Sequence, residues 1–77
     1  MKYNVVFSFT EMHVPRGLGL CFQGMQGDVE ILAERPLSLQ DPEQVEALCE
    51  LIAADLCRQG HNVIRNMLKI ESLTPLN

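Results

Sequence analysis

The sequence has few basic residues. Six Lys and Arg stand against ten Asp and Glu, which gives a formal net charge of −4. The basic residues are scattered, and no two of them are adjacent in the sequence. A surface that binds phosphate groups needs clustered positive charge, so this acidic composition argues against a nucleic-acid-binding protein.

Paired cysteines and long apolar runs are missing as well. Cys21, Cys49 and Cys57 are an odd number without close pairs, which is not typical of a disulfide framework and favours a reducing compartment. No stretch approaches the roughly 20 apolar residues that span a bilayer, and no signal peptide is visible. We therefore expect a cytoplasmic protein that does not associate with membranes.

The residue sets that usually carry chemistry are also sparse. No Cys-x2-Cys or His-x3-His pair of the usual zinc spacing occurs, and no pair of carboxylates can be identified as buried. The chain has two histidines, His13 and His61, and both fall in predicted loops, where an exposed polar role is the simpler interpretation. We predict no catalytic residues, no metal site and no cofactor, although the sequence leaves open whether either histidine has a chemical role.

What remains is a short chain of ordinary globular composition. Its 77 residues suffice for one domain, and 47% of them are hydrophobic. A domain of this size has a thin core, which often requires a metal, a disulfide or a partner chain for additional stability.

Alternating residues predict strands in the first half of the chain. The first strand, over about 2–11, buries the face that carries Tyr3, Val5, Phe7 and Phe9. Pro15, Arg16 and Gly17 supply a turn, and two further strands are expected over about 18–24 and 28–35. The segment 24–27, with glycine at both ends, is predicted to be the hairpin connection between them.

An amphipathic helix is predicted over about 42–59. Asp41 is a good N-cap, Pro42 suits the first helical position, and Gly60 lies where a left-handed C-terminal cap is expected. One apolar stripe follows the helical period and comprises Val45, Leu48, Cys49, Ile52 and Leu56. We expect this stripe to pack on the sheet.

After the helix, alternation predicts a fourth strand over about 63–71, although the same segment also fits a helical period. The tail 72–77 contains Pro75 and is expected to be irregular. The predicted fold is α+β: a four-stranded, mainly antiparallel sheet of order β-β-β-α-β with one amphipathic helix packed on one face. The fourth strand would lie parallel to the first or third, and pairing with the first gives the spatial order 4-1-2-3.

The outer side of the helix carries the one patterned group of charges. Glu43, Glu46 and Glu50 form a stripe beside small residues, and an ordinary solvated helix face is the simpler interpretation. The alternative is a docking face for a protein partner. That candidate face comprises Glu43, Glu46, Ala47, Glu50, Ala54 and Cys57.

The sheet suggests a second candidate surface. Four strands span about 19 Å and one helix is about 10–12 Å across, so a single helix covers little more than half of one face. The opposite face would carry an apolar patch that favours self-association as a twofold dimer. The candidate residues are Val6, Cys21, Leu32, Val63 and Met67.

These features lead to three functional hypotheses. The first is a non-enzymatic, acidic protein-interaction module that acts as a homodimer and binds an unidentified protein partner. The second is a nucleic-acid-binding domain that uses the open sheet face, with Tyr3 or the Phe residues together with Arg65 and Lys69. The third is a small enzyme or ligand-binding protein whose site forms at a dimer interface. In overall style the chain resembles small accessory proteins of phages and bacterial mobile elements, although no motif carries that resemblance.

Overall fold

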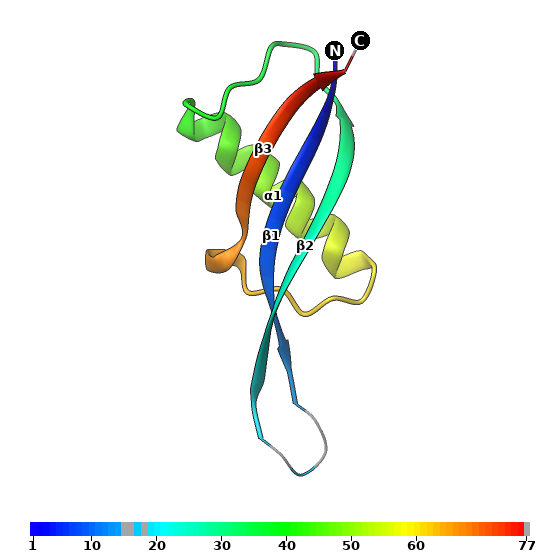
Figure 1. The fold of residues 1–77 in the computed structure, drawn as a ribbon, viewed down its shortest axis with the longest axis vertical. Coiled ribbons are helices and arrows are strands. Elements are labelled where there is room, and N and C mark those ends of the chain that lie inside the picture. Colours follow the sequence, from blue (N-terminus) through cyan, green and yellow to red (C-terminus); the bar gives the residue numbers. More distant parts are fainter. Residues whose placement is uncertain (15–16, 18, 77) are drawn as a thin grey trace.

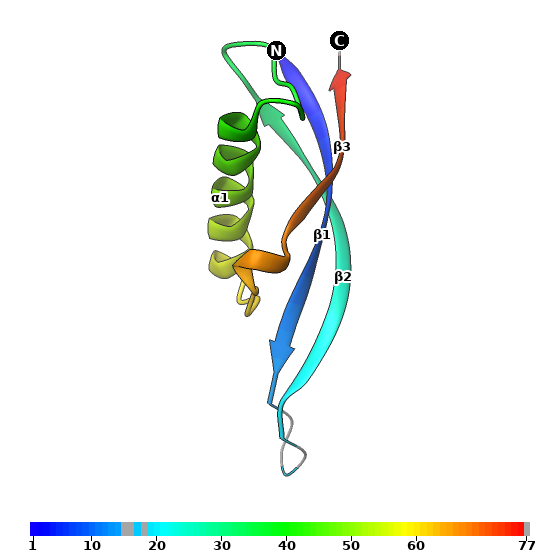
Figure 2. The ribbon, with the colours of Figure 1, turned by 90° about the vertical axis from the view of Figure 1, so that its left-hand side faces the viewer.

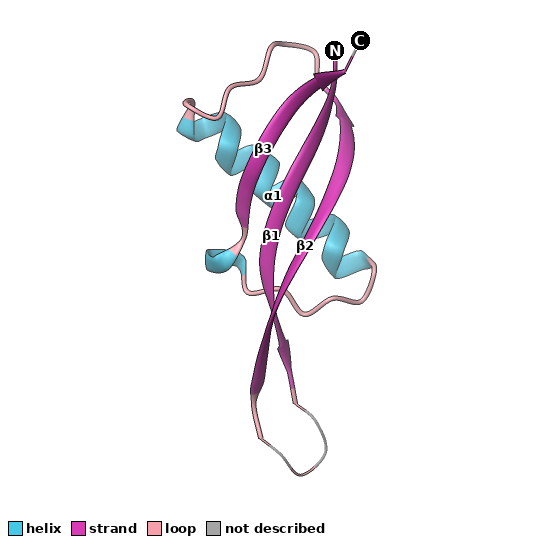
Figure 3. Ribbon diagram, in the orientation of Figure 1, coloured by secondary structure: helices cyan, strands magenta, loops and turns pink. Residues whose placement is uncertain are grey.

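Three strands and one long helix organise the chain in a computed structural model that describes residues 1–14, 17 and 19–76 (Figure 1; Figure 3). The elements follow in the order β1 (Lys2–His13), β2 (Cys21–Leu32), α1 (Pro42–Arg58), the 3₁₀ turn η1 (Arg65–Met67) and β3 (Lys69–Leu76). β1 is the central strand of the sheet, whose order is β2-β1-β3. Both neighbours pair with β1 in the antiparallel sense.

The alternation of β1 determines which sheet face is buried. Its odd-numbered residues from Tyr3 to Glu11 are buried, whereas the even-numbered ones between them are half-buried. α1 packs against the odd-numbered face, and the opposite face is left open (Figure 2). The core cluster joins the two layers and comprises Tyr3, Val5, Phe7, Phe9, Cys49, Ile52, Leu56 and Leu68.

The helix begins and ends where the capping residues predict. The Asp41 carboxylate accepts hydrogen bonds from the N–H groups of Glu43 and Gln44, at 3.1 and 3.5 Å. Pro42 is the first helical residue, and Gly60 follows the C-cap with φ of +95°, a conformation that glycine adopts without steric cost. Leu48, like Cys49, Ile52 and Leu56, is buried on the inner face of α1, so the predicted apolar stripe contacts the sheet.

The prediction of a hairpin connection at 24–27 is wrong. These residues lie inside β2, where Gly24 pairs with Thr10 and Gly27 pairs with Phe7. Neither glycine has a positive φ, whereas Gly17 and Gly19, in the connection between β1 and β2, both have φ of +73°. The predicted turn residues Pro15 and Arg16, and Leu18 at the start of the predicted second strand, lie outside the described residues. The two predicted strands are therefore replaced by one strand, β2, because β1 continues far enough to pair with all of Cys21–Leu32.

The second half of the sheet also differs from the prediction. Val63 makes only an isolated bridge with Glu11, η1 follows it, and β3 occupies most of the tail that was expected to be irregular. Pro75 pairs opposite Tyr3 on an outer strand, a position in which the missing N–H of proline is tolerated. Within the described residues the sheet thus has three strands instead of the predicted four, and the strand after the helix is antiparallel to β1.

The molecule is elongated, with principal extents of 48 × 21 × 17 Å. Much of that length comes from the β1–β2 hairpin, whose far end extends beyond the end of α1 (Figure 2). No helix among the described residues is long and apolar enough to cross a membrane.

Candidate functional site

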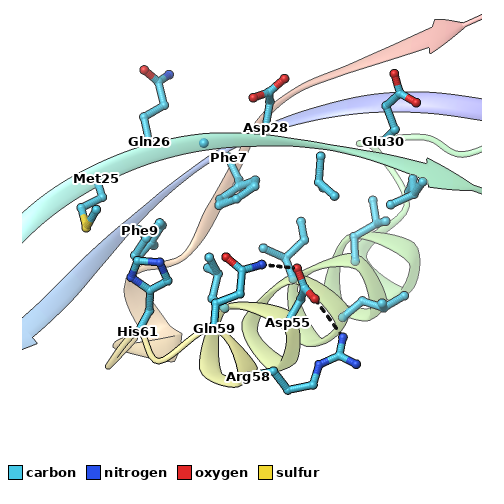
Figure 4. Close-up of a pocket in the computed structure, with 17 residues that line it drawn as sticks. Phe7, Phe9, Met25, Gln26, Asp28, Glu30, Asp55, Arg58, Gln59 and His61 are labelled. Carbon is cyan, nitrogen blue, oxygen red and sulfur yellow. Dashed lines mark hydrogen bonds and ion pairs between the residues drawn. The ribbon is translucent and has the colours of Figure 1, made fainter.

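A groove lies between α1 and the inner face of β2 (Figure 4). Its volume is about 520 Å³, and its floor includes the core residues Phe7 and Phe9 of the central strand. Met25 and Val29 line it from β2, and Leu48 and Ile52 line it from α1. The groove is therefore an opening into the core, at the place where one helix is too narrow to cover the sheet.

Leu51 gives the helix side of the groove an apolar rim. The residue lines the groove, yet 60% of it is exposed to solvent. Its neighbours Leu48 and Ile52 are buried, so Leu51 adds an accessible apolar surface to a wall that is otherwise part of the core. Exposed leucines on a groove wall are typical of surfaces that bind apolar side chains.

Polar residues line the groove at the C-terminal end of α1. Asp55 accepts hydrogen bonds from Arg58 Nη2 at 2.9 Å and from Gln59 Nε2 at 2.8 Å. These bonds fix the last turn of α1 beside the groove, as the dashed lines in Figure 4 show. Arg58 is thus paired within its own helix.

The outer edge of β2 is free of a strand partner. β2 pairs with β1 on one side, and no other described strand pairs with it. Twelve residues, Cys21–Leu32, form this edge, and Phe22, Gly24, Gln26, Asp28, Glu30 and Leu32 along it are all exposed. An unpaired edge presents a row of backbone donors and acceptors to any extended chain that reaches it.

A second cluster joins Glu11 to both histidines. Glu11 is 8% exposed, and its two carboxylate oxygens contact His61 Nδ1 at 2.5 Å and His13 Nε2 at 2.9 Å. His61 also packs edge-on against Phe9, with ring centroids 5.7 Å apart. In the described chain, neither imidazole forms a hydrogen bond with a hydroxyl or a thiol. The cluster thus ties the end of β1 to the segment after α1, and it lacks a paired nucleophile.

The predicted docking face on α1 is exposed, as the helical period indicates. All six of its residues are accessible: Glu43, Glu46, Ala47, Glu50, Ala54 and Cys57. Its negative charge is partly neutralised, however, because Arg65 of η1 forms ion pairs with Glu46 at 2.7 Å and with Glu50 at 3.1 Å. No pattern in the sequence indicates that Arg65 lies against this face.

The residues of the predicted self-association patch do not come together. Leu32 lies at one end of β2 and Cys21 at the other, where Cys21 shares the helix-side face with its partner His13. Val6 lies on the open face between Asp28 and Ser72, while Val63 and Met67 lie in or beside η1. The open face is mostly polar around Val6, and this geometry gives the predicted patch no continuous apolar surface.

The three thiols have different surroundings. Cys49 is buried, whereas Cys21 and Cys57 are exposed, and none of the three is in a disulfide. Burial raises the pKa of the Cys49 thiol; Arg65 lowers it, and Glu46 and Glu50 raise it further. Among the described residues, no group of three or more His, Cys, Asp or Glu side chains is placed to hold a metal ion.

Two important residues were missed from the sequence, although each left a signal. Glu11 continues the odd-numbered alternation of Tyr3 to Phe9, so the pattern itself places a carboxylate on the buried face. Leu51 lies three residues after Leu48 and broadens the apolar stripe on one side. Comparisons with protein-family models, with curated proteins and with solved structures find no match for this chain.

Proposed function

We propose that this protein is a non-enzymatic interaction module that binds a segment of another protein in the groove between α1 and β2. The observation that carries the proposal is an open groove of about 520 Å³ whose floor is the hydrophobic core and whose helix side bears Leu51, 60% exposed. Grooves with mainly apolar walls and a few polar groups are the usual form of binding sites. Three free cysteines support a reducing, cytoplasmic location as part of the same proposal.

The charges of the open face support this proposal over nucleic-acid binding. Lys2 and Lys69 lie among acidic residues there, with Asp28, Glu30 and Glu71 from the two outer strands. Phosphate groups would meet repulsion across most of that face. The aromatic residues that such binding would use are buried in the core, where Tyr3 is 6% exposed and Phe7 is 5% exposed.

A selection experiment tests the groove directly. Random peptides displayed on phage are selected on the wild-type protein, and the selected peptides are then tested on Leu51→Glu. A charge at the apolar wall should reduce their binding by about tenfold or more, because the incoming apolar side chains would meet a carboxylate.

Ala54→Glu is the matched control, since it adds the same side chain to an exposed position on the outer side of the same helix. It should bind the selected peptides as the wild type does. Equal binding to Leu51→Glu, or selection of no peptide at all, contradicts the proposal. Far-ultraviolet circular dichroism establishes that both variants keep their helix.

A further inference from the structure

The hydrogen bonds of β1 show which backbone groups of β2 face outward. Met1 and Ala33 exchange both backbone bonds, Met1 N to Ala33 O at 2.9 Å and Ala33 N to Met1 O at 2.8 Å. The β1–β2 register then continues without a shift from Lys2 opposite Leu32 to His13 opposite Cys21. Hydrogen-bonded and non-hydrogen-bonded pairs alternate in an antiparallel ladder. The odd-numbered residues of β2 therefore bond to β1, and the even-numbered ones direct their N–H and C=O groups to the free edge.

Hydrogen bonds on the other side of β1 agree with this assignment. Met12 donates to Asn62 O, and Thr10 O accepts from Ile64 N, each at 3.0 Å. The backbone N–H and C=O groups of the even-numbered residues of β1 thus point away from β2. Along β2, the outward groups belong to Phe22, Gly24, Gln26, Asp28, Glu30 and Leu32, and no hydrogen bond within the described chain takes them up.

The two sides of this edge differ in chemistry. Met25, Gly27, Val29 and Ile31 face the groove, whereas Gln26, Asp28 and Glu30 point away from it, to the other side of β2 (Figure 4). Gly27 has no side chain, so the ring of Phe7 lies directly beneath the strand there. Among the described residues, neither Asp28 nor Glu30 has an ion-pair partner.

We infer that β2 accepts an added strand from a partner protein, and that this strand alternates aliphatic and basic residues. The inference rests on the proposed function and specifies its partner. Side chains of an added strand alternate between the two faces of the sheet. Those on the groove side enter an apolar space beside Leu51, and those on the other side meet Asp28 and Glu30. Aliphatic residues fit the first environment, and Lys or Arg fits the second.

The same charges disfavour a second copy of this chain as the occupant. An antiparallel β2–β2 pairing brings Asp28 and Glu30 of both copies into one short ladder, and carboxylates near one another across a ladder repel. The net charge of −4 adds to this repulsion. Charged residues on an edge strand are also a known means of preventing self-pairing. A strand with Lys or Arg residues would instead be attracted by the carboxylates of Asp28 and Glu30.

The probe is a short peptide of alternating lysine and isoleucine, about seven residues long, which matches the length of a typical strand. Wild-type protein should bind it in a titration followed by fluorescence anisotropy. Asp28→Lys with Glu30→Lys should weaken this binding by about tenfold and should instead bind a peptide of alternating glutamate and isoleucine. Glu43→Lys, at an exposed position on α1, makes the same kind of charge change away from β2 and should leave lysine-peptide binding intact.

Two backbone changes separate strand addition from simple charge attraction. Gln26→Pro removes an N–H that faces the free edge, so it should keep the fold and abolish binding. In the peptide, N-methyl groups on every second residue should abolish binding when they face β2, and the other alternate set should be tolerated. Binding that is lost in Leu51→Glu but survives Gln26→Pro and both methylation patterns would overturn strand addition while the groove proposal stands.

Other outcomes are equally decisive. If the lysine peptide does not bind, or binds the charge-reversed variant as well as the wild type, the inference fails. If light scattering shows a dimer of the free protein that Gln26→Pro dissociates, a second copy occupies the edge and the inference also fails. Phage-selected peptides that depend on Leu51 would still support the proposed function in either case.

Discussion

Gly27 lies in β2 at a point where Phe7 leaves no room for a side chain. A Cβ built at Gly27 would lie 3.0 Å from Phe7 Cζ and 3.3 Å from Phe7 Cε2, whereas one at Gly24 would meet nothing within 4 Å. Phe7 belongs to the core, so its ring cannot move outward without loss of packing. At the scale of single residues, Gly27 allows close packing, and its role in the strand differs from that of a turn glycine.

Gly27→Ala should therefore destabilise the protein by about 1–3 kcal/mol, because the added methyl group displaces a packed ring. Gly24→Ala is the matched control in the same strand and should change the free energy of unfolding by less than about 1 kcal/mol. Urea unfolding of both variants measures the difference. Equal effects of the two substitutions would show that the region does not pack as described.

Among the polar residues, Glu11 is the one that is buried in close contact with its neighbours, His13 and His61. Glu11→Ala leaves His13 and His61 without their shared partner and should cost about 1–3 kcal/mol in the free energy of unfolding. His61→Ala should cost more than His13→Ala, because the His61 side chain is 30% exposed and that of His13 is 44% exposed. Thermal and urea unfolding of the three variants check this order. A larger loss from His13→Ala would contradict the geometry of the cluster.

The ionisation of Cys49 makes the free energy of unfolding depend on pH, and burial of the thiol determines the sign of that dependence. Its pKa is raised above the ordinary value of 9.0, so the folded state holds the thiol proton more tightly than the unfolded state does. The resulting contribution to stability is complete below about pH 9 and is lost as the pH rises through the raised pKa.

Cys49→Ala should therefore show a smaller loss of unfolding free energy than the wild type between about pH 8 and about pH 10. In the native protein, a thiol reagent at about pH 8 should modify Cys21 and Cys57 rapidly and Cys49 only after unfolding. Mass spectrometry of the modified protein identifies the sites. Rapid native labelling of Cys49 would contradict its burial.

At the scale of elements, β3 shows why a tail can become a strand. Its Leu73 packs against the core, and its residues pair with β1 from Lys2 opposite Leu76 to Ser8 opposite Lys69. The sequence suggested an irregular tail because Pro75 normally breaks a ladder. β3 nevertheless pairs with the central strand β1, because an outer strand accommodates the proline.

A chain that ends at Ser72 should lose its cooperative unfolding transition, because it lacks the Leu73 packing and half of the β3 ladder. Pro75→Thr in the full chain should keep or increase the free energy of unfolding, because threonine favours strands. Urea unfolding followed by circular dichroism tests both. A truncated protein as stable as the full chain would show that β3 is dispensable.

The elements that the sequence predicted well are those whose signals are local. The capped helix has Asp41, Pro42 and Gly60 at its ends, and the first strand has a strict alternation of apolar residues. The prediction divides the second strand in two because Gly24 and Gly27 resemble turn residues, and only the position of Phe7 across the ladder explains the glycine at position 27. The strand after the helix was misplaced because pairing with β1 is a long-range interaction.

At the scale of the whole molecule, this thin protein leaves part of its sheet uncovered. One helix covers part of one sheet face, and the uncovered part becomes the groove that ends at the free edge of β2. The sequence analysis predicted incomplete cover for a sheet of four strands, and the sheet of three described strands still has a groove beside the helix. It could not locate the groove, because its position depends on where α1 crosses the three strands.

Amide hydrogen exchange followed by NMR, with and without the lysine–isoleucine peptide, tests the central claim most directly. In the free protein, the odd-numbered amides of β2 should exchange slowly because they bond to β1, and those of Gln26, Asp28 and Glu30 should exchange rapidly. Added peptide should slow the exchange of these three even-numbered amides while the outer face of α1 stays unchanged. Unaltered exchange at Gln26, Asp28 and Glu30 under saturating peptide would contradict the account.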